Sequence, residues 1–291
     1  MKSARLALPA LLLGAVGIGF SPIFMRISEL GPQGSAFHRV FLALPLIWGI
    51  RFIETRRPTP SPGPKTRRDY ALFVLSGFFF AGDLAFWHWS VAYTSVANAT
   101  LLANFAPIFV TLAAYVLFGA RFSGMFYAAL VISTSGAIIL LGDSASLGGD
   151  HLFGDSLGMI TALFYAAYIL TVSHVRSRFS VSAFMAWGTL STVIFLLPVA
   201  LLSGENLIPA TLYGWLVLLG LAWFSHTGGQ GLIAYALAHL PAAFSSLALL
   251  FQPAIAAFAA WVILGEAMSA LQLFGAGVIL SGIYIARRAS Q

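Results

Sequence analysis

The chain has 291 residues, of which 59% are hydrophobic and only 8% are charged, and its formal net charge is +6. Soluble proteins carry about 25% charged residues. A single soluble core of this length could not bury so many apolar side chains, because the surface of a protein grows with its size. The composition therefore excludes soluble globular and disordered proteins and indicates a chain embedded in a lipid bilayer.

Ten apolar runs follow one another along the sequence. A helix across a bilayer core about 30 Å thick needs roughly 20 apolar residues, whereas the strands of a membrane barrel alternate over about ten residues. The runs are continuous and cover residues 6–25, 35–53, 70–92, 96–117, 123–142, 154–173, 181–202, 211–234, 242–264 and 270–287. We therefore expect an all-α integral membrane protein with ten transmembrane helices.

Two segments near the start of the chain need a separate interpretation. The first run follows Lys2 and Arg5 but lacks a clear small-x-small cleavage site, so we expect a retained helix rather than a signal peptide. The longest connection, at about 54–69, is expected to be an exposed linker. Its prolines are Pro58, Pro60, Pro62 and Pro64.

The basic residues are unevenly divided between the two ends of such a bundle. Ten helices put both termini on one side, which would hold all but two of the 15 lysines and arginines; Arg26 and Arg39 fall near the other side. Because basic residues stay in the cytoplasm during insertion, we predict a multi-pass protein of the cell inner (plasma) membrane with both termini cytoplasmic. The charge is thus a topology signal, and we expect no nucleic-acid partner. The opposite side is expected to hold Glu29, Asp143, Asp150, Asp155, Glu205 and Glu266.

Several kinds of chemistry have no basis in the sequence. It contains no cysteine, which excludes disulfides, thiolate zinc sites and cysteine nucleophiles. It also lacks Gly-x-Ser-x-Gly, His-Glu-x-x-His and phosphate-loop motifs. We therefore expect no metal, no cofactor and no enzymatic activity, and we expect any transport work to come from a solute gradient.

The sequence repeats itself at a distance of 146 residues, where the fourth run faces the ninth. The matching pairs are Phe105/Phe251, Pro107/Pro253, Ala113/Ala259, Ala114/Ala260, Val116/Val262, Gly119/Gly265, Ser123/Ser269, Ser135/Ser281 and Gly136/Gly282. Each half has five runs, and an odd number makes the halves insert in opposite orientations. Inverted repeats are typical of transporters, whose halves rock about a site at their interface. We expect one repeat in residues 1–142 and an inverted one in residues 143–291, around a central cavity.

Two prolines hold equivalent places in these repeats. Pro107 and Pro253 each remove a backbone hydrogen bond, which predicts hinges in the fourth and ninth helices. Proline is also common in membrane helices, so packing kinks without a moving role are the alternative.

Short motifs along the chain point to one transporter family. They are Pro22-Ile-Phe-Met-Arg26, Gly31-Pro32, Phe37-His-Arg39-Val-Phe-Leu, Ala92-Tyr-Thr-Ser-Val-Ala97 and Leu264-Gly-Glu266-Ala-Met-Ser269. With these motifs the whole chain resembles the drug/metabolite transporter superfamily, in its EamA-type family, and it is most similar to the aromatic amino-acid exporter type. In this resemblance Arg39 matches the arginine that opens the second helix. The first half departs from the pattern, because Ala120 stands where the second half has Glu266.

The third run carries the first candidate for the substrate site. An ionisable residue at the centre of a transmembrane helix costs roughly 2.5–3.5 kcal/mol on insertion scales. Asp83 lies near that centre, with Trp87 one turn later on the same face and His88 close by. An ionised Asp83 could bind a substrate amino group, and a protonated one could carry a coupling proton. A hydrogen bond to a neighbouring helix is the structural alternative.

The eighth run contains His226-Thr-Gly-Gly-Gln230-Gly. His226 and Gln230 are one turn apart and share a face, and the glycines allow another helix or a solute to come close. Cavity lining and structural packing are both open for this pair.

Polar stripes in three further runs extend the predicted site. The sixth run places Thr161, Tyr165 and Tyr168 on one face. Asn104 in the fourth run and Gln252 in the ninth should face protein or water, because lipid does not reward an amide. Interhelical hydrogen bonds are the alternative for each of these residues.

Other residues have weaker signals. Trp187 and Trp223 could add aromatic walls, whereas Phe78, Phe79 and Phe80 are expected to pack or to face lipid. We expect Arg39, at the external end of the second helix, to snorkel to the interface. Recognition of an anionic group is the alternative.

These features predict a transporter that exports a small-molecule substrate across the lipid bilayer by alternating access. Amino acids are the favoured substrates, and the resemblance favours aromatic ones. A multidrug or other metabolite exporter is the first alternative, and a membrane-embedded enzyme and a non-transporting scaffold are two others. Asp83 and the polar eighth run speak against the scaffold. The sequence leaves the coupling mechanism and the oligomeric state open.

Overall fold

The computed structural model describes residues 2–57, 63–142 and 151–289. Within these ranges ten helices are long and apolar enough to cross a membrane, which confirms the ten predicted runs. In chain order, spans 1 to 10 are Leu6–Arg26, Pro32–Thr55, Arg67–Tyr93, Ala97–Phe118, Gly124–Gly142, Leu152–Arg176, Val181–Leu202, Leu212–Ala236, Ala242–Leu264 and Ala270–Ala289. Pro58, Pro60, Pro62, Asp143 and Asp150, which the sequence placed in connections, lie outside the described residues.

Half of the spans are single helices and half are interrupted. The single helices are α5 (Arg67–Tyr93), α8 (Gly124–Gly142), α9 (Leu152–Arg176), α10 (Val181–Leu202) and α15 (Ala270–Ala289). The interrupted spans are α1–α2 (Lys2–Gly19, Ser21–Arg26), α3–α4 (Pro32–Phe41, Leu44–Thr55), α6–α7 (Val96–Ala103, Ala106–Phe118), α11–η2–α12 (Leu212–Gly220, Leu221–Gln230, Gly231–Ala236) and α13–α14 (Ala242–Ala248, Phe251–Leu264). The segment η2 is π-helical.

Proline accounts for four of the interruptions. Pro22, Pro45 and Pro107 lie in the first turn of α2, α4 and α7, and Pro253 is the third residue of α14. A proline has no N–H to donate to the carbonyl four residues earlier, and its ring crowds that carbonyl. The preceding helix therefore ends, and free backbone groups are left at membrane depth, which is tolerated only inside protein or beside a cavity.

The two halves fold alike where their sequences match. Both α7 and α14 end at a glycine with left-handed backbone, Gly119 at φ 63° and Gly265 at φ 70°, a conformation that favours glycine. The residue after each glycine donates its N–H to a carbonyl six residues earlier, that of Ala114 at 3.1 Å and that of Ala260 at 3.3 Å. The same helix end thus recurs at the 146-residue distance of the repeat.

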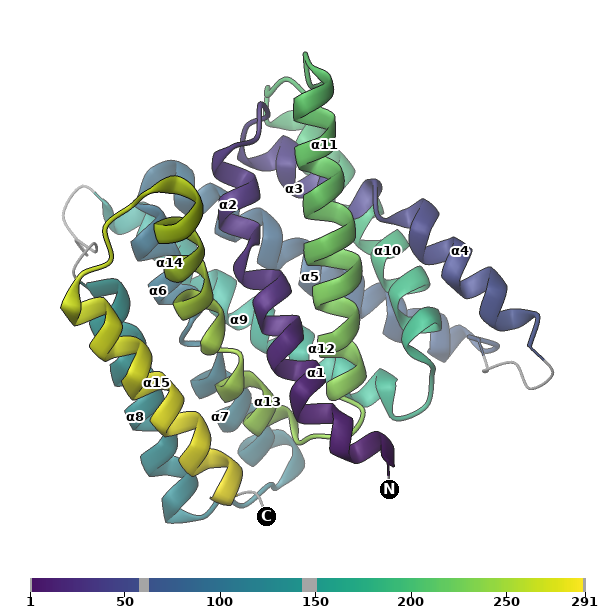
Figure 1. The fold of residues 1–291 in the computed structure, drawn as a ribbon. Helices are drawn as coiled ribbons and strands as arrows, with labels where there is room; N and C mark the ends of the chain where they lie inside the picture. Colours follow the sequence, from purple (N-terminus) through teal and green to yellow (C-terminus); the bar gives the residue numbers. More distant parts are fainter. Residues whose placement is uncertain (1, 58–62, 143–150, 290–291) are drawn as a thin grey trace.

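Helices α8 and α15 pack side by side and show how the halves are related (Figure 1). A Cβ on Gly136 would lie 2.7 Å from the backbone nitrogen of Ile279, and one on Gly282 would lie 2.8 Å from that of Ser133. The repeat exchanges these two contacts, because Gly136 corresponds to Gly282 and Ser133 to Ile279. Residue numbers rise along one helix as they fall along the other, so the two five-helix repeats are inverted.

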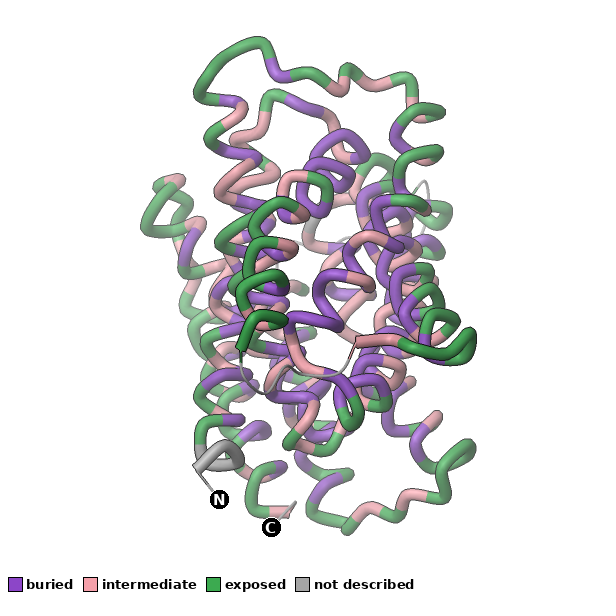
Figure 2. The backbone as a smooth tube through the Cα atoms, turned by 90° about the vertical axis from the view of Figure 1, so that its right-hand side faces the viewer, coloured by how far each residue is buried: buried purple, intermediate pink, exposed green. Residues whose placement is uncertain are grey.

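The outer surface of the bundle is apolar. Large side chains such as Leu117, Leu202 and Leu212 are exposed by 70%, 87% and 75%, and in a membrane this surface contacts lipid. Figure 2 shows the buried positions gathered between the helices and the exposed ones on their outer sides and at the ends. Both termini lie at the same end (Figure 1). We call this the terminal end and the opposite one the distal end.

Three acidic residues fasten the distal end. Arg26 forms an ion pair with Glu266. Glu205 accepts hydrogen bonds from the backbone nitrogens at the start of α3, the shorter one 2.8 Å from Gly34. Glu29 accepts a hydrogen bond from the hydroxyl of Thr211. This bond, together with hydrogen bonds from two backbone N–H groups, holds the pKa of Glu29 below its usual value. Loops from both halves are therefore tied together above the centre of the bundle.

Candidate functional site

A cavity of about 120 Å³ lies at the centre of the bundle, where the two halves meet. One water needs roughly 10–15 Å³ of such a cavity, so there is room for a small solute. The first half contributes Ile18, Ser21, Pro22, Arg39, Phe80, Asp83, Leu84, Trp87, Thr100, Ala103 and Asn104. The second half contributes Thr161, Tyr165, Gln230, Gln252, Pro253 and Ala256. The interruptions of spans 1, 4 and 9 all reach this cavity.

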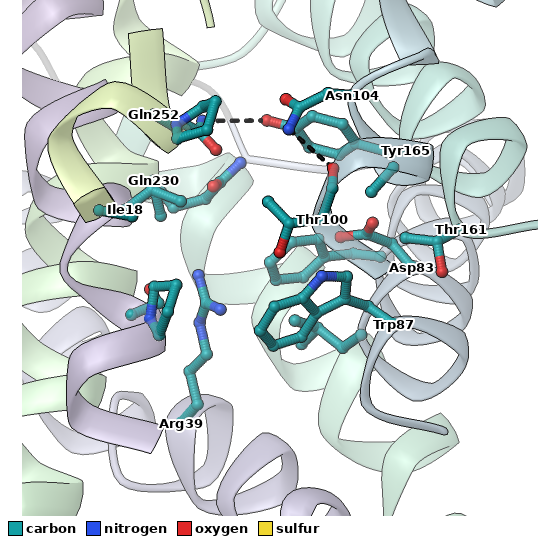
Figure 3. Close-up of a pocket in the computed structure, with 17 residues that line it drawn as sticks. Ile18, Arg39, Asp83, Trp87, Thr100, Asn104, Thr161, Tyr165, Gln230 and Gln252 are labelled. Carbon is teal, nitrogen blue, oxygen red and sulfur yellow. Dashed lines mark hydrogen bonds between the residues drawn. The ribbon is translucent and has the colours of Figure 1, made fainter. Parts of the chain in front are cut away.

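Arg39 reaches into the cavity from α3, and Asp83 faces the same space from α5 (Figure 3). Arg39 is only 6% exposed, so it does not snorkel as expected. The reason is that the helix begins at Pro32, which places Arg39 two turns inside the bundle rather than at its end. Within the described part of the chain, neither side chain has a hydrogen bond or an ion pair, and the Nε of Arg39 is buried without a partner.

Trp87 follows Asp83 by one turn and lines the cavity beside it, as their shared helix face predicted (Figure 3). His88 does not line the cavity. Its Nδ1 donates to the carbonyl of Leu84 at 2.6 Å, the residue is 2% exposed, and its ring packs against that of Trp87. A helix turns by about 100° per residue, so neighbours at 87 and 88 cannot both face the same space.

The predicted amides do converge on the cavity. Gln252 lies 3.5 Å from the hydroxyl of Tyr165, to which its Nε2 donates, and Asn104 donates to the carbonyl of Thr100 at 2.7 Å. Gln230 lines the cavity from η2 and donates to the hydroxyl of Tyr168 at 2.8 Å. Fixed in this way, the amides leave carbonyl oxygens with which a solute can interact.

Tyr168 and His226 lie behind the cavity wall. Both border a second, smaller cavity of about 10 Å³, which is separated from the first by Phe80. His226 is 1% exposed, and its Nε2 shares a hydrogen bond of 3.0 Å with the hydroxyl of Thr189. The predicted pair on the eighth span is therefore divided between the two cavities, with Gln230 on the central one and His226 on the smaller one.

The glycines of this span act as predicted. A Cβ on Gly17 would lie 2.9 Å from the Cα of Gly229, so α1 and η2 approach backbone to backbone. This close packing holds Gln230 against the centre of the bundle.

Two tryptophans lie away from the cavity. Trp187 packs edge-on against Trp48 and Tyr70, with ring centroids 5.3 Å and 5.1 Å apart. Trp223 is 48% exposed and donates its indole N–H to the carbonyl of Leu42, in the break of span 2, at 3.0 Å. In this conformation neither provides the aromatic wall that the sequence suggested.

The two predicted hinges occupy equivalent breaks but different surroundings. Pro107 is buried away from the cavity, whereas Pro253 lines it. Sequence analysis did not select Ser21 and Phe80, which also line the cavity. Pro22 was the available signal for Ser21, because a proline early in a span predicts a break there.

Comparison with known proteins gives consistent matches. Residues 5–142 and 152–288 each match the sequence pattern of the EamA-like transporter family. An "uncharacterized transporter" of Archaeoglobus fulgidus is 28% identical over 62% of this chain and 62% of its own length. A "probable terminal-alkyne amino-acid exporter" of Streptantibioticus cattleyicolor is 26% identical over 69% and 67% of the two chains. A "probable amino-acid metabolite efflux pump" of Salmonella typhimurium is 26% identical over 82% and 84%.

A solved crystal structure has the same fold. It superposes with a TM-score of 0.81 and covers 100% of this chain and 98% of the other, at 14% sequence identity. This likeness concerns the fold alone.

Proposed function

Because the chain belongs to the EamA-like transporter family, we propose that it exports amino acids from the cytoplasm, aromatic ones in particular, by alternating access. The family and the names of its relatives indicate a transporter rather than an enzyme. The observation that carries the finer proposal is the central cavity. It combines the charged groups of Arg39 and Asp83, three amides and the rings of Trp87 and Tyr165 in one space.

The chemistry of this lining supports an amino acid better than a sugar. Opposite charges suit the two ionised groups of an amino acid, and Trp87, Tyr165 and Phe80 offer apolar and aromatic surface to its side chain. A sugar would leave both charges without a charged partner. The names of two relatives, an amino-acid exporter and an amino-acid metabolite efflux pump, support the same substrate class.

A row of cavities between the centre of the bundle and the terminal end supports the direction of transport. The small second cavity shares Phe80 with the central cavity, and it shares Met185 with a groove of about 500 Å³. Arg57, Arg176 and Tyr235 line this groove, at the end of the bundle where the basic residues concentrate. The distal end is fastened by Glu29, Glu205 and Glu266, so we propose that a substrate enters from the terminal end when Phe80 moves aside.

The same scheme assigns the sides of the membrane. We place the terminal end, with both termini, in the cytoplasm and the protein in the inner membrane, because basic residues stay cytoplasmic. Each repeat, residues 1–142 and 143–291, then supplies one moving half. Pro107 and Pro253 are the proposed hinges, since each lies beside a break where a helix can bend without losing further backbone bonds.

Uptake into liposomes tests the substrate class. Purified protein would be reconstituted, and uptake of labelled amino acids, sugars and cationic drugs would be compared with uptake into empty liposomes. We expect saturable uptake of aromatic amino acids and competition among amino acids. Uptake of cationic drugs without amino acids would instead favour the multidrug alternative.

A further inference from the structure

The two charged groups of the central cavity line the same space, and neither forms a hydrogen bond or an ion pair with the described residues. We propose that Arg39 and Asp83 form a clamp for a zwitterion, in which Arg39 binds the α-carboxylate and Asp83 binds the α-ammonium group of one free amino acid. This inference rests on the proposed amino-acid substrate. It goes further in requiring both ionised groups on the same molecule.

Arg39 is an exception among the buried charges of the described residues. Arg51 pairs with Glu54 at 3.2 Å, Asp69 with Arg178 at 3.1 Å, and Arg176 donates to a backbone carbonyl at 3.0 Å. Asp155 accepts from Thr94 at 3.0 Å. Arg39, at 6% exposure, has no such contact. An unpaired buried charge is costly, so its guanidinium is in place for a charge that arrives with a ligand.

The chemistry of Arg39 selects a carboxylate. A guanidinium presents parallel N–H donors in a fork that matches the two oxygens of a carboxylate. Ser21 and Thr100 also lack partners for their polar groups. Both line the same cavity, and their buried hydroxyls have no hydrogen bond among the described residues. Buried polar groups are normally hydrogen-bonded. A ligand with several polar atoms would satisfy all three side chains.

Asp83 and Trp87 together suit an ammonium group. They lie one turn apart on α5 and both line the cavity (Figure 3). A carboxylate accepts the N–H donors of an ammonium, and an indole face attracts a cation through its quadrupole. An ammonium between them would thus contact two groups that are already held on the same helix face.

The balance of charge makes the clamp selective. When Arg39 and Asp83 are both ionised, the one positive and one negative charge among the lining residues cancel. An amine without a carboxylate would pair with Asp83 but be repelled by Arg39. An acid without an amino group would pair with Arg39 but be repelled by Asp83. Only a molecule with both charges compensates both side chains at once, so the clamp rejects amines and acids that share the substrate's side chain.

Three compounds with one side chain test the clamp. L-phenylalanine is a zwitterion, L-phenylalaninamide is a cation, and N-acetyl-L-phenylalanine is an anion. We expect the wild-type protein in liposomes to take up L-phenylalanine at least tenfold better than either analogue. Comparable uptake of the amide or of the N-acetyl compound would overturn the clamp while leaving amino-acid export intact. No uptake or binding of any amino acid would overturn both proposals.

Single substitutions identify the role of each charge. Arg39→Gln should remove the preference for L-phenylalanine over the amide but keep its preference over the N-acetyl compound. Asp83→Asn should do the opposite. Arg39→Lys and Asp83→Glu keep the charges and should retain much of the discrimination. Arg178→Gln, a half-exposed arginine outside the cavity, is the matched control and should leave all ratios unchanged.

Folding is monitored for every variant by gel filtration in detergent. If a neutral variant fails to fold, the Lys and Glu variants still report through their selectivity ratios. If Arg39→Gln and Asp83→Asn lower uptake of all three compounds by the same factor, both residues act structurally and the clamp is wrong.

Discussion

The ring of Phe80 lies over the imidazole of His226, with ring centroids 5.5 Å apart and planes inclined by 26°. Tyr168 also stacks on Phe80, at 4.6 Å. Phe80 is 3% exposed and borders both the central cavity and the small cavity that holds His226. This aromatic stack therefore closes the central cavity on the side that leads to the terminal end.

The stack predicts how two introduced cysteines react. Gln230→Cys should react with small water-soluble thiol reagents, and substrate should slow the reaction, because Gln230 lines the central cavity. His226→Cys should be at least tenfold slower, because Phe80 covers it. Adding Phe80→Ala should expose Cys at 226, since the truncation connects the two cavities. The native chain has no cysteine, so the background is clean.

A matched control separates this effect from general loosening. Phe78 lies on the same helix but is 42% exposed. Phe78→Ala should leave the reactivity at position 226 unchanged. If Phe78→Ala exposes position 226 as much as Phe80→Ala does, or if Cys at 226 reacts freely in the otherwise native protein, Phe80 is not the closing group.

The helices and the repeat were accessible from sequence because their signals are local. An apolar run of about 20 residues has few alternatives in a membrane, and the matching prolines and glycines fix the register between the halves. Gly119 and Gly265 show this best, since the same left-handed helix end recurs at both. Inversion then follows from the odd number of spans in each half.

The site was only partly accessible, because side-chain direction depends on where each helix begins and how it winds. Asp83, Trp87, Tyr165 and Gln252 follow regular helix periodicity and all line the cavity, and their role in substrate binding stays a prediction. Arg39 was expected at a helix end, but the helix begins at Pro32 and carries it inward. His226 and Gln230 border different cavities, because Phe80 of another span lies between them, and the helix pattern of the eighth span alone does not reveal this.

Labelling from the two sides of the membrane tests the proposed topology. Because basic residues stay in the cytoplasm, labels near Lys65 and at the C-terminus should report the cytoplasm and a label near Asp150 the outside. Accessibility of single cysteines to an impermeant reagent in intact cells measures this, with permeabilised cells as the control. A label near Asp150 that reports the cytoplasm would contradict the opposed insertion of the two halves.

The contact between α8 and α15 predicts opposite effects of two similar substitutions. Gly282→Ala places a Cβ against Ser133, 2.8 Å from its backbone nitrogen, and such overpacking costs about 1–3 kcal/mol. Gly277→Ala, on the same helix, meets nothing within 4 Å and should be neutral or stabilising by up to about 1 kcal/mol, because alanine favours helix. Thermal unfolding in detergent would compare the two. Equal midpoints would mean that the interface opens without cost.

Glu29 predicts a dependence of stability on pH. The Thr211 hydroxyl and the backbone N–H groups of Thr211 and Ala210 lower the pKa of Glu29 from 4.5 in the folded protein. A carboxyl whose pKa is lower in the folded than in the unfolded protein stabilises the fold fully at a pH above its pKa in the unfolded protein. This stabilisation is lost as the pH falls through its pKa in the folded protein. Glu29→Gln should therefore be less stable than wild type at pH 7, and the difference should shrink below pH 4.5. Thr211→Val should also narrow the stability difference between the proteins with Glu29 and with Glu29→Gln, because it removes the hydroxyl that lowers the pKa. A stability difference that persists unchanged at acidic pH would refute the role of the carboxylate.

The ion pair between Arg26 and Glu266 predicts control over the distal end. It joins the end of span 1 to the loop between spans 9 and 10, and its side chains are about half exposed, 49% and 46%. Exposed pairs contribute only about 0–1 kcal/mol, but two conformations that differ by a few kcal/mol shift several-fold in population for each kcal/mol. Arg26→Gln or Glu266→Gln should therefore favour the conformation open at the distal end.

A cysteine at Ser21, which lines the cavity below this pair, reports the opening. Its reaction with an impermeant thiol reagent added from the distal side should accelerate several-fold in either single variant. The exchanged pair, Arg26→Glu with Glu266→Arg, should restore the slow rate, because the attraction is the same with the charges reversed. High salt should accelerate the thiol reaction in the protein with the native pair, because exposed charges are screened. The reaction rate of the single variants should not change with salt. An exchanged pair that reacts as fast as the single variants would show that the loops are held by packing rather than by charge.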